Sequence, residues 1–283
     1  MMILENVKEV GPAAVGSKLD ARSRYLRRLI VTALDGGGRG HVGSALSLIE
    51  IIRVLYDDIV KFSSEDPGME LRDRVILSKG HGCLALYAVL ADKGYISKDC
   101  LKEFCTMDAV LGGHPEDKVP GVEASTGSLG HGLSIGVGIA IATRMKRLPS
   151  YTYVIMGDGE INEGSVWEAA MAASKHQLDR LVAVIDYNKL QSYGSTSEVL
   201  ELEPLVDKWE SFGFDVCEVD GHGIDELRQA LSKEKLVAGK PKAVICHTVK
   251  GKGLPFAENN LGWHHKSKLR AEEIQHMYEA LGK

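Results

Sequence analysis

The feature that most constrains this chain is a glycine-flanked aspartate between a strand and a helix. An apolar strand over 152–156 runs into Asp158, a helix over 163–175 follows, and a second apolar strand over 181–186 runs into Asn188. A strand, a helix and a strand in this order predict a right-handed βαβ unit whose two strands are parallel. Asp158 and Asn188 would then lie at the carboxyl ends of neighbouring strands, where open α/β sheets bind ligands.

These two residues have the chemistry of a metal site. A carboxylate and a side-chain amide oxygen are hard ligands for Mg²⁺ or Ca²⁺, and Mg²⁺ commonly completes its shell with water and phosphate oxygens. Gly157 and Gly159 flank Asp158 and allow a ligand to approach the backbone closely. An isolated Gly-Asp-Gly would be interpreted as a tight turn, with Asn188 as a cap. Their joint position at strand ends favours a metal and diphosphate site instead.

The rest of the chain repeats this alternation and indicates an α/β fold with a mainly parallel sheet and helices on both faces. Further strands are predicted over 74–78, 214–218 and 242–248, and further helices over 44–60, 130–146, 203–212 and 224–233, besides helices that end near Leu34 and Lys93. Between them, residues 111–129 predict a long glycine-rich loop of a kind that is often functional.

The pattern predicts an arm over 1–20 and a single domain over 21–283. A C-terminal extension is expected from about Gly251, and residues 250–253 are expected to form a mobile turn near the entrance of the cleft.

Composition excludes several function classes. Lysine and arginine number 34 and aspartate and glutamate number 39, so the formal net charge is −5. A mildly acidic chain without a long basic run argues against nucleic-acid binding, and the longest apolar stretch is too short to span a bilayer. The five cysteines include no CxxC pair, and no signal-peptide pattern is present, which together predict reduced thiols and a cytoplasmic protein.

Histidines divide into two groups by their neighbours. Three adjoin glycine at predicted loop or strand ends, where an imidazole can bind a diphosphate, hold a sugar hydroxyl or move a proton: His41, His81 and His114. Three others lie beside charged residues in helical or turn contexts, and we expect them on the surface: His176, His222 and His276. The sequence leaves the environments of His131 and His247 open.

Five ordered motifs, together with the Gly-Asp-Gly and asparagine pair, resemble the transketolase family. They are Gly40-His41, Ser78-Lys79-Gly80-His81-Gly82, Gly113-His114-Pro115-Glu116, Ser125-Thr126-Gly127-Ser128-Leu129-Gly130 and Trp263-His264. The resemblance runs from about Leu26 to about His265. This chain departs from the family at His265, where many transketolases have glycine, and at Leu190, where others often have isoleucine.

The resemblance implies a thiamine diphosphate-binding fold and assigns roles to the motif residues. Mg²⁺, for which Ca²⁺ or Mn²⁺ could substitute, would be held by Asp158, Asn188 and the carbonyl of Leu190. The cofactor would be contacted by His81, Gly127, Ser128, Leu129, Gly157, Asp158, Gly159, Asn188 and His264. His41 and His114 would contact hydroxyls of a donor sugar, and His264 would also take part in proton transfer. Glu163 would lie at a dimer interface, in a network that links two active sites.

The activity implied is that of a transferase of carbohydrate and pentose phosphate metabolism, which moves a two-carbon ketol unit from a ketose or its phosphate to an aldose acceptor. The pyrimidine-binding domain and the C-terminal domain of transketolases have no counterpart here. The chain therefore resembles the N-terminal subunit of a split transketolase, active only with a C-terminal partner subunit in an α2β2 heterotetramer, although a fragment of a longer chain would look the same.

Two alternatives stay open. One is a subunit of another thiamine diphosphate enzyme, either similar to deoxyxylulose-phosphate synthase or a specialised ketose-cleaving enzyme. The histidine motifs and Trp263-His264 favour a transketolase over it. The other is a non-catalytic scaffold subunit that binds the cofactor, and the intact Asp158 and Asn188 argue against that.

Overall fold

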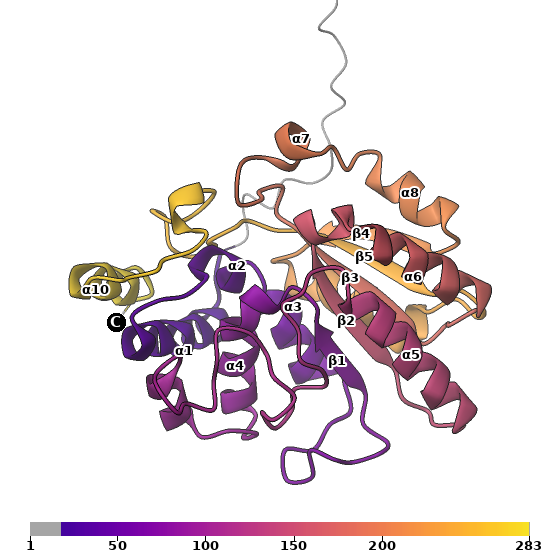
Figure 1. Ribbon diagram of the computed structural model, residues 1–283, viewed down its shortest axis with the longest axis horizontal. Helices are drawn as coiled ribbons and strands as arrows, with labels where there is room; N and C mark the ends of the chain where they lie inside the picture. The colour runs from indigo at the N-terminus through magenta and orange to yellow at the C-terminus, as the bar shows by residue number, and fades with distance from the viewer. Residues whose placement is uncertain (1–17, 283) are drawn as a thin grey trace, which may run out of the picture.

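Five parallel strands form one sheet in the part of the chain that the structure describes, residues 18–282 of a computed structural model (Figure 1). The strands are β1 (Arg74–Leu77), β2 (Thr152–Gly157), β3 (Leu181–Tyr187), β4 (Asp215–Asp220) and β5 (Lys242–His247). Their order across the sheet is β1-β2-β3-β5-β4, and each neighbouring pair is parallel. This confirms the predicted α/β class.

Helices cover both faces of the sheet because alternate residues of each strand point to opposite sides. On one face, Val154 and Met156 belong to a core cluster with residues of α5 (Gly132–Met145), α6 (Gly164–Lys175) and α8 (Leu205–Ser211). On the other, Tyr153 and Ile155 belong to a cluster with residues of α1 (Ala21–Gly37), α3 (Ile49–Val54), α4 (Cys83–Asp92) and α9 (Ile224–Leu231).

Helix α1 shows how local sequence sets a boundary. The carboxylate of Asp20 accepts a hydrogen bond from the backbone N–H of Ser23 at 2.7 Å and so caps the start of the helix. Gly38 follows the end with φ 64°, and its N–H donates to the carbonyl of Leu34 at 2.8 Å. Glycine adopts this left-handed conformation without a steric penalty, so the glycine run ends the helix as predicted.

The helix predicted over 44–60 is divided into α2 (Val42–Leu46), α3 and a π-helical turn, Leu55–Ile59. Ser47 lies at the first break. Its hydroxyl donates to the carbonyl of Ser44 at 3.1 Å and to the carboxylate of Asp186 at 2.7 Å. Side-chain bonds of this kind compete with the helical pattern, and this one connects the break to the edge of the sheet.

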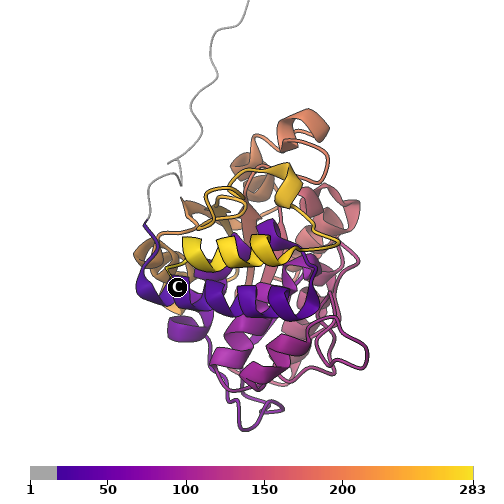
Figure 2. The ribbon, with the colours of Figure 1, turned by 90° about the vertical axis from the view of Figure 1, so that its left-hand side faces the viewer.

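The C-terminal segment contains a helix that the sequence analysis did not predict. Helix α10 (Ala271–Ala280) buries Ile274 and Met277 and lies alongside α1 (Figure 2). The remaining elements are short: α7 (Thr196–Val199) and the 3₁₀ helices Gly80–Gly82, Lys98–Glu103, Gly159–Asn162, Lys233–Lys235 and Leu261–Trp263.

Residues 111–129 contain neither helix nor strand, as predicted. The predicted arm over 1–20 lies outside the described residues except for its last three. Within residues 18–282, no helix has both the length and the apolar character needed to cross a membrane.

Candidate active site

Asp158 and Asn188 lie together at the carboxyl edge of the sheet, as the sequence predicts. Asp158 directly follows β2 and Asn188 directly follows β3, and these two strands are paired in parallel. Both residues are buried, with exposed fractions of 4% and 6%. The βαβ connection therefore places a carboxylate and an amide beside each other beneath the edge of the sheet.

The oxygens of these two side chains keep acceptor capacity. Oδ1 of Asp158 accepts from the N–H of Gly159 at 2.7 Å, and Oδ2 accepts from the N–H of Lys189 at 2.6 Å. Oδ1 of Asn188 accepts from the N–H of Leu190 at 3.2 Å. Each of these oxygens has a second lone pair that such a bond leaves free. The backbone hydrogen bonds thus orient these oxygens and leave each of them able to accept a further bond.

A buried ion pair lies next to them. The ammonium of Lys79 donates to Oδ2 of Asp186, which also accepts from the Ser47 hydroxyl, and the Thr248 hydroxyl donates to Oδ1. Burial alone would raise the pKa of Asp186, but the charge and hydrogen bond of Lys79 lower it. Asp186 therefore stays ionised at the end of β3.

Asp158 differs from Asp186 in its electrostatics. Burial, followed by the nearby charge of Asp186, raises the pKa of Asp158 from an ordinary 3.8 to about 6. Lys250 approaches from the other side, and its ammonium donates to the Leu190 carbonyl at 2.7 Å. Burial and the charge of Lys79 lower the pKa of Lys250 to about 8. Among the described residues, no cation pairs directly with Asp158 as Lys79 pairs with Asp186.

A cavity of about 220 Å³ opens above these groups. Most of its lining residues are polar or glycine, and they come from the ends of β2 and β3 and from five other segments: Ser44, Lys79, His81, Leu129, Gly157, Asp158, Gly159, Glu160, Asn188, Leu190, Gln191, Ser192, Tyr193, Lys250 and His264. Among the described residues, two side-chain nitrogens in this lining are buried without a hydrogen-bond partner, Nε2 of Gln191 and Nδ1 of His264. Because unpaired buried donors are costly, they indicate a missing acceptor.

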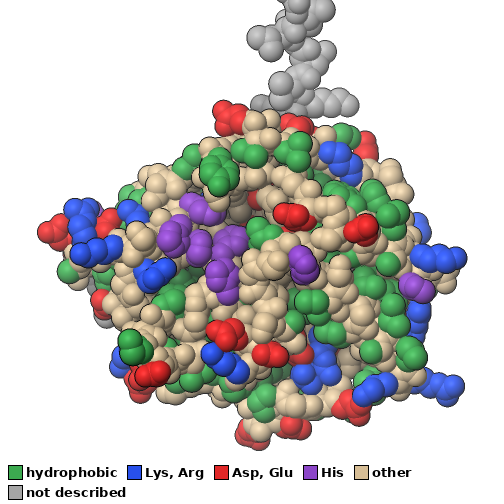
Figure 3. All heavy atoms as spheres, in the orientation of Figure 1, with side chains coloured by type: hydrophobic (Ala, Val, Ile, Leu, Met, Phe, Trp, Pro, Cys, Tyr) green, Lys and Arg blue, Asp and Glu red, His purple; other side chains and the backbone are tan. Residues whose placement is uncertain are grey.

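Histidine rings form one wall beside this cavity. The ring centroid of His41 lies 5.4 Å from that of His81, 6.0 Å from that of His114 and 5.9 Å from that of His264. His265 adds a fifth ring, 4.5 Å from His41. Figure 3 shows histidine side chains gathered beside a hollow on this face of the molecule. Four histidines that the sequence analysis singled out, from four separate motifs, therefore meet in one place.

Four histidines of this wall, all but His265, have lowered pKa values and are neutral near pH 7. Burial, followed by the charge of His265, lowers the pKa of His41 to about 4. Burial, followed by the charge of Lys250, lowers the pKa of His264 to about 3. Burial also lowers the pKa of His81 and of His114. A neutral imidazole offers one donor and one acceptor, which suits it to hydroxyl groups.

Comparisons with known proteins agree with this geometry. Residues 20–283 match the family model described as transketolase, thiamine diphosphate binding domain. The chain belongs to the transketolase family. It is 42% identical over 247 residues to a subunit of the apulose-4-phosphate transketolase of Phocaeicola vulgatus, covering 87% of this chain and 88% of that one. It is 43% identical over 255 residues to the 6-deoxy-6-sulfo-D-fructose transketolase subunit SqwG of a Clostridium species, covering 90% and 92%.

Solved transketolases share the fold. The transketolase of Leishmania mexicana superposes with a TM-score of 0.86 at 33% identity, covering 94% of this chain. The chain spans 42% of the length of that solved protein. The predicted thiamine diphosphate-binding fold is thereby confirmed.

The donor set of the cavity fits thiamine diphosphate bound through a divalent cation. Within the described residues, no group of three His, Cys, Asp or Glu side chains could hold a metal ion alone. A cation here would need amide and carbonyl oxygens from Asn188 and Leu190 beside the Asp158 carboxylate, with further oxygens from its ligand. The amide nitrogen of Gln191 is suited to binding that anion, as is Nδ1 of His264 in the tautomer that carries its proton there.

Only some of the other residues that were predicted to contact the cofactor line the cavity. Leu129, Gly157 and Gly159 line the cavity, whereas Gly127 and Ser128 are not part of the lining. Gly127 instead lies against His114, where a Cβ would come within 2.8 Å of the ring.

Glu163 is exposed at the residue before α6, where its side chain makes no capping hydrogen bond, and a Cβ on Gly130 would come within 2.6 Å of the Glu163 Cβ. Glu163 is not part of the cavity lining, and its interface role stays a prediction.

Sequence analysis missed a second acid in the same motif. Glu160 is buried and accepts from the N–H of Gly130 at 3.0 Å, from the N–H of Gly157 at 3.1 Å and from the Ser78 hydroxyl. Burial raises its pKa. Glu160 thereby joins the loop before α5 to the turn after β2. The sequence feature that could have identified Glu160 is its position directly after Gly157-Asp158-Gly159.

Two expectations are wrong. His222 was expected on the surface but is buried, and its Nδ1 lies 2.8 Å from a carboxylate oxygen of Glu50. The charged neighbour Asp220 accepts from the backbone N–H of His222 at 2.8 Å, whereas the ring packs inward against Glu50. The turn over residues 250–253 was expected to be a mobile element at the entrance, but Lys250 and Lys252 are buried and the turn is fixed by hydrogen bonds.

Proposed function

We propose that this chain is the cofactor-binding subunit of a two-chain transketolase that moves a two-carbon ketol unit from a ketose, or its phosphate, to an aldose acceptor. The observation that carries the proposal is the juxtaposition of two chemistries at one sheet edge. Buried oxygens and unpaired nitrogens suited to a cation and a diphosphate lie directly beside a wall of neutral histidines suited to sugar hydroxyls.

In this proposal Mg²⁺ is held by the carboxylate of Asp158, Oδ1 of Asn188 and the carbonyl of Leu190. Lys79, Lys250 and His81 face the diphosphate from the cavity lining, together with Nε2 of Gln191. Bound thiamine diphosphate supplies an electron sink for the pair released when a carbon–carbon bond next to a carbonyl breaks. The protein's contribution is to bind the diphosphate end and orient the reacting end toward the histidines.

The histidine wall would bind the donor. His41 and His114 can each donate one hydrogen bond and accept one, so they can fix the direction of neighbouring hydroxyls on an open-chain sugar. His264 has its Nε2 3.1 Å from the Ser192 hydroxyl, which fixes the ring and leaves Nδ1 to hold or pass a proton. Because burial keeps these rings neutral, they can exchange protons without a standing charge in the site.

A partner subunit would cover the outer face of α5 and α6. This face carries exposed methionines at Met145 and Met171, with exposed fractions of 79% and 55%, and partly buried Ile135 and Ile139. Gly130, just before α5, and Glu163, at the start of α6, lie against each other at one end of these two helices. A pyrimidine-binding domain seated there would reach the cofactor, and relatives at this length are named as transketolase subunits. We propose an α2β2 assembly on this basis.

The test is a ketol-transfer assay with purified chain, thiamine diphosphate and Mg²⁺, with and without the candidate partner chain. Apulose 4-phosphate and 6-deoxy-6-sulfofructose are donors to include, because the two relatives are named for them. Activity is expected only in the mixture. Met171→Glu should prevent activation by disrupting the covered face, while Lys268→Glu, an exposed change near the other end of the fold, should not.

Strong activity of the chain alone would contradict the two-chain proposal. Absence of thiamine diphosphate binding by the mixture would contradict the cofactor assignment itself.

A further inference from the structure

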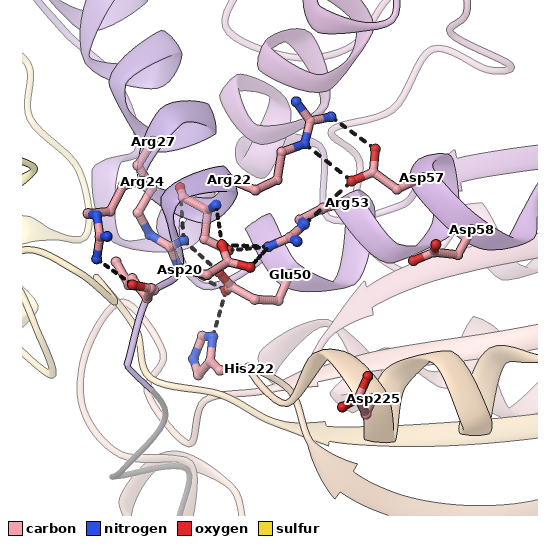
Figure 4. Close-up of polar contacts among 12 residues, drawn as sticks. Asp20, Arg22, Arg24, Arg27, Glu50, Arg53, Asp57, Asp58, His222 and Asp225 are labelled. Atoms are coloured by element: carbon pink, nitrogen blue, oxygen red, sulfur yellow. Dashed lines mark hydrogen bonds and ion pairs between the residues drawn. The ribbon is translucent and has the colours of Figure 1, made fainter.

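A second buried charge cluster lies beneath the turn that carries Lys250. We name Arg27, Glu50 and His222 the Glu50 cluster. The guanidinium of Arg27 binds the carboxylate of Glu50 in a fork, with distances of 2.6 and 2.9 Å, and Nδ1 of His222 lies 2.8 Å from the same carboxylate (Figure 4). The side chains of Arg27, Glu50 and His222 are 0%, 2% and 1% exposed. Their elements are α1, α3 and the loop after β4.

The hydrogen bonds of this cluster define its protonation. The backbone N–H of Val249 donates to Nε2 of His222 at 2.9 Å. Nε2 must therefore be the acceptor nitrogen, so the ring proton is on Nδ1 and donates to Glu50. Arg27 has acceptors for all five of its N–H groups, because it also donates to the carbonyls of Ser23, Leu46 and Lys252. The cluster is completely satisfied.

Two members of the cluster hold the two ends of one turn. The turn over Val249–Lys252 is closed by the N–H of Lys252, which donates to the carbonyl of Val249 at 3.1 Å. Nε2 of His222 accepts from the N–H of Val249, the first residue of the turn. Nε of Arg27 donates to the carbonyl of Lys252, the last residue of the turn, at 2.8 Å. In the middle, the N–H of Gly251 donates to the carbonyl of Gly43 at 3.0 Å.

This turn determines where one cation of the cavity lies. Lys250 is its second residue, and its side chain runs into the cavity to the Leu190 carbonyl, one of the proposed metal ligands. A Cβ on Gly43 would lie 3.0 Å from Cγ of Lys250, so the stem of the lysine is closely packed. A small rotation of the turn would therefore move the ammonium.

We infer that Arg27, Glu50 and His222 are positioning residues that fix the Lys250 ammonium in the diphosphate cavity by holding both ends of the Val249–Lys252 turn. This inference rests on the proposed function for the identity of the ligand, but not for the geometry. His222 is the most direct link, since one of its nitrogens contacts the turn and the other contacts Glu50.

The two nitrogens of His222 can be tested separately. Asparagine places an amide near Nδ1, where it can satisfy Glu50 but cannot reach Val249. Glutamine places its amide near Nε2, where its oxygen can accept from the Val249 N–H. Trace labelling with acetic anhydride, read by mass spectrometry, reports the exposure and basicity of Lys250 in the unliganded full chain, with the exposed Lys268 as internal reference.

His222→Asn is expected to speed labelling of Lys250 at least fivefold, and His222→Gln to keep it within about twofold of the native rate. A role confined to satisfying Glu50 would produce the opposite order, with asparagine near native and glutamine impaired. Unchanged labelling in a folded His222→Asn chain would overturn the inference. If that variant does not fold, Arg27→Lys removes the bond to the Lys252 carbonyl at the other end of the turn and is expected to show the same increase.

Calorimetric titration with Mg²⁺ and thiamine diphosphate then connects the turn to the ligand. His222→Asn should weaken binding about tenfold, and in a Lys250→Met background it should have no further effect, because it acts through Lys250. Additive losses in the two backgrounds would contradict the inference. If the variants show the expected labelling pattern but the native chain mixed with its partner binds no thiamine diphosphate, the proposed function is contradicted and the positioning role remains.

Discussion

The two buried charge clusters of this molecule lie on adjacent elements but differ in how completely their charges are paired. In the Glu50 cluster every N–H of Arg27 has an acceptor, and the guanidinium and His222 hold the pKa of Glu50 well below its usual range despite burial. In the cavity cluster, which comprises Lys79, Asp158, Asp186 and Lys250, the pKa of Asp158 is raised and that of Lys250 is lowered.

This difference distinguishes a charge cluster that supports the structure from one that belongs to a binding site. A closed cluster keeps its charges in the free protein and has no capacity left for a ligand. In the cavity cluster burial disfavours the charged forms of Asp158 and Lys250, and pKa shifts of this kind are typical of binding and catalytic sites. Buried charge alone therefore does not mark a functional site here, whereas incomplete pairing of that charge does.

The largest expected effect comes from removing the carboxylate of the open cluster. Asp158→Asn should weaken Mg²⁺-dependent binding of thiamine diphosphate by at least 100-fold, because it removes the only charged ligand of the proposed metal site. The amide oxygen can accept only one of the two backbone hydrogen bonds that the carboxylate accepts from Gly159 and Lys189, so circular dichroism is used to confirm that the variant is folded. Calorimetric titration measures the affinity. Asp225→Asn, at an exposed residue on α9, is the matched control, and equal affinity in the two variants would remove the metal assignment.

The closed cluster should respond in stability instead. Glu50→Gln leaves the Arg27 guanidinium buried without a counter-charge, and breaking a buried pair in this way costs about 3–5 kcal/mol of unfolding free energy. Urea denaturation followed by circular dichroism measures the loss. A change below about 1 kcal/mol would show that the Glu50 cluster is not closed as described.

The pH dependence of stability should distinguish the clusters further. The pKa of Asp158 is about 6 in the folded chain against an ordinary 3.8, so the folded state binds this proton more tightly than the unfolded state. Its contribution to stability is fully present below pH 4 and is lost as the pH rises through 6. In metal-free buffer, Asp158→Asn should therefore gain on the order of 2 kcal/mol relative to native chain between pH 4 and pH 8. A constant difference across this range would contradict the raised pKa.

Local sequence was sufficient to bring Asp158 and Asn188 together in the cavity, but not to predict the Glu50 cluster. Asp158 and Asn188 follow strands of one βαβ unit, so a pattern of about thirty residues brings them together. Glu50 and His222 are separated by 172 residues, and their contact depends on how α3 packs against the loop after β4. The sequence offers no periodicity for such a contact, and the charged neighbours of His222 predicted the opposite.

Similar limits apply to the fold. The strands were predicted well because most of them are short apolar runs between turn residues; the exception is the edge strand β4, which mixes charged and apolar residues. The helix over 44–60 was predicted as continuous, which is wrong, because its break depends on a hydrogen bond from the Ser47 hydroxyl to Asp186, 139 residues away. Lys79 belongs to one of the sequence motifs, but its burial against Asp186 could be seen only after β1 and β3 were placed.

The smallest expected effect lies outside both clusters, on the histidine wall. His114 belongs to the long loop, its ring lies 6.0 Å from that of His41, and it is not part of the cavity lining. His114→Ala should therefore lower kcat/KM for a ketose donor by about 10- to 100-fold, because one hydroxyl contact is lost, while the affinity for thiamine diphosphate stays within about twofold of native. Steady-state kinetics of the assembled enzyme and calorimetry measure the two quantities separately, and His176→Ala, an exposed histidine after α6, controls for loss of an imidazole. If His114→Ala instead weakened the binding of thiamine diphosphate and left turnover normal at saturating cofactor, the histidine wall would be part of the diphosphate site. The distinction between a charged cavity and a neutral histidine wall would then be wrong.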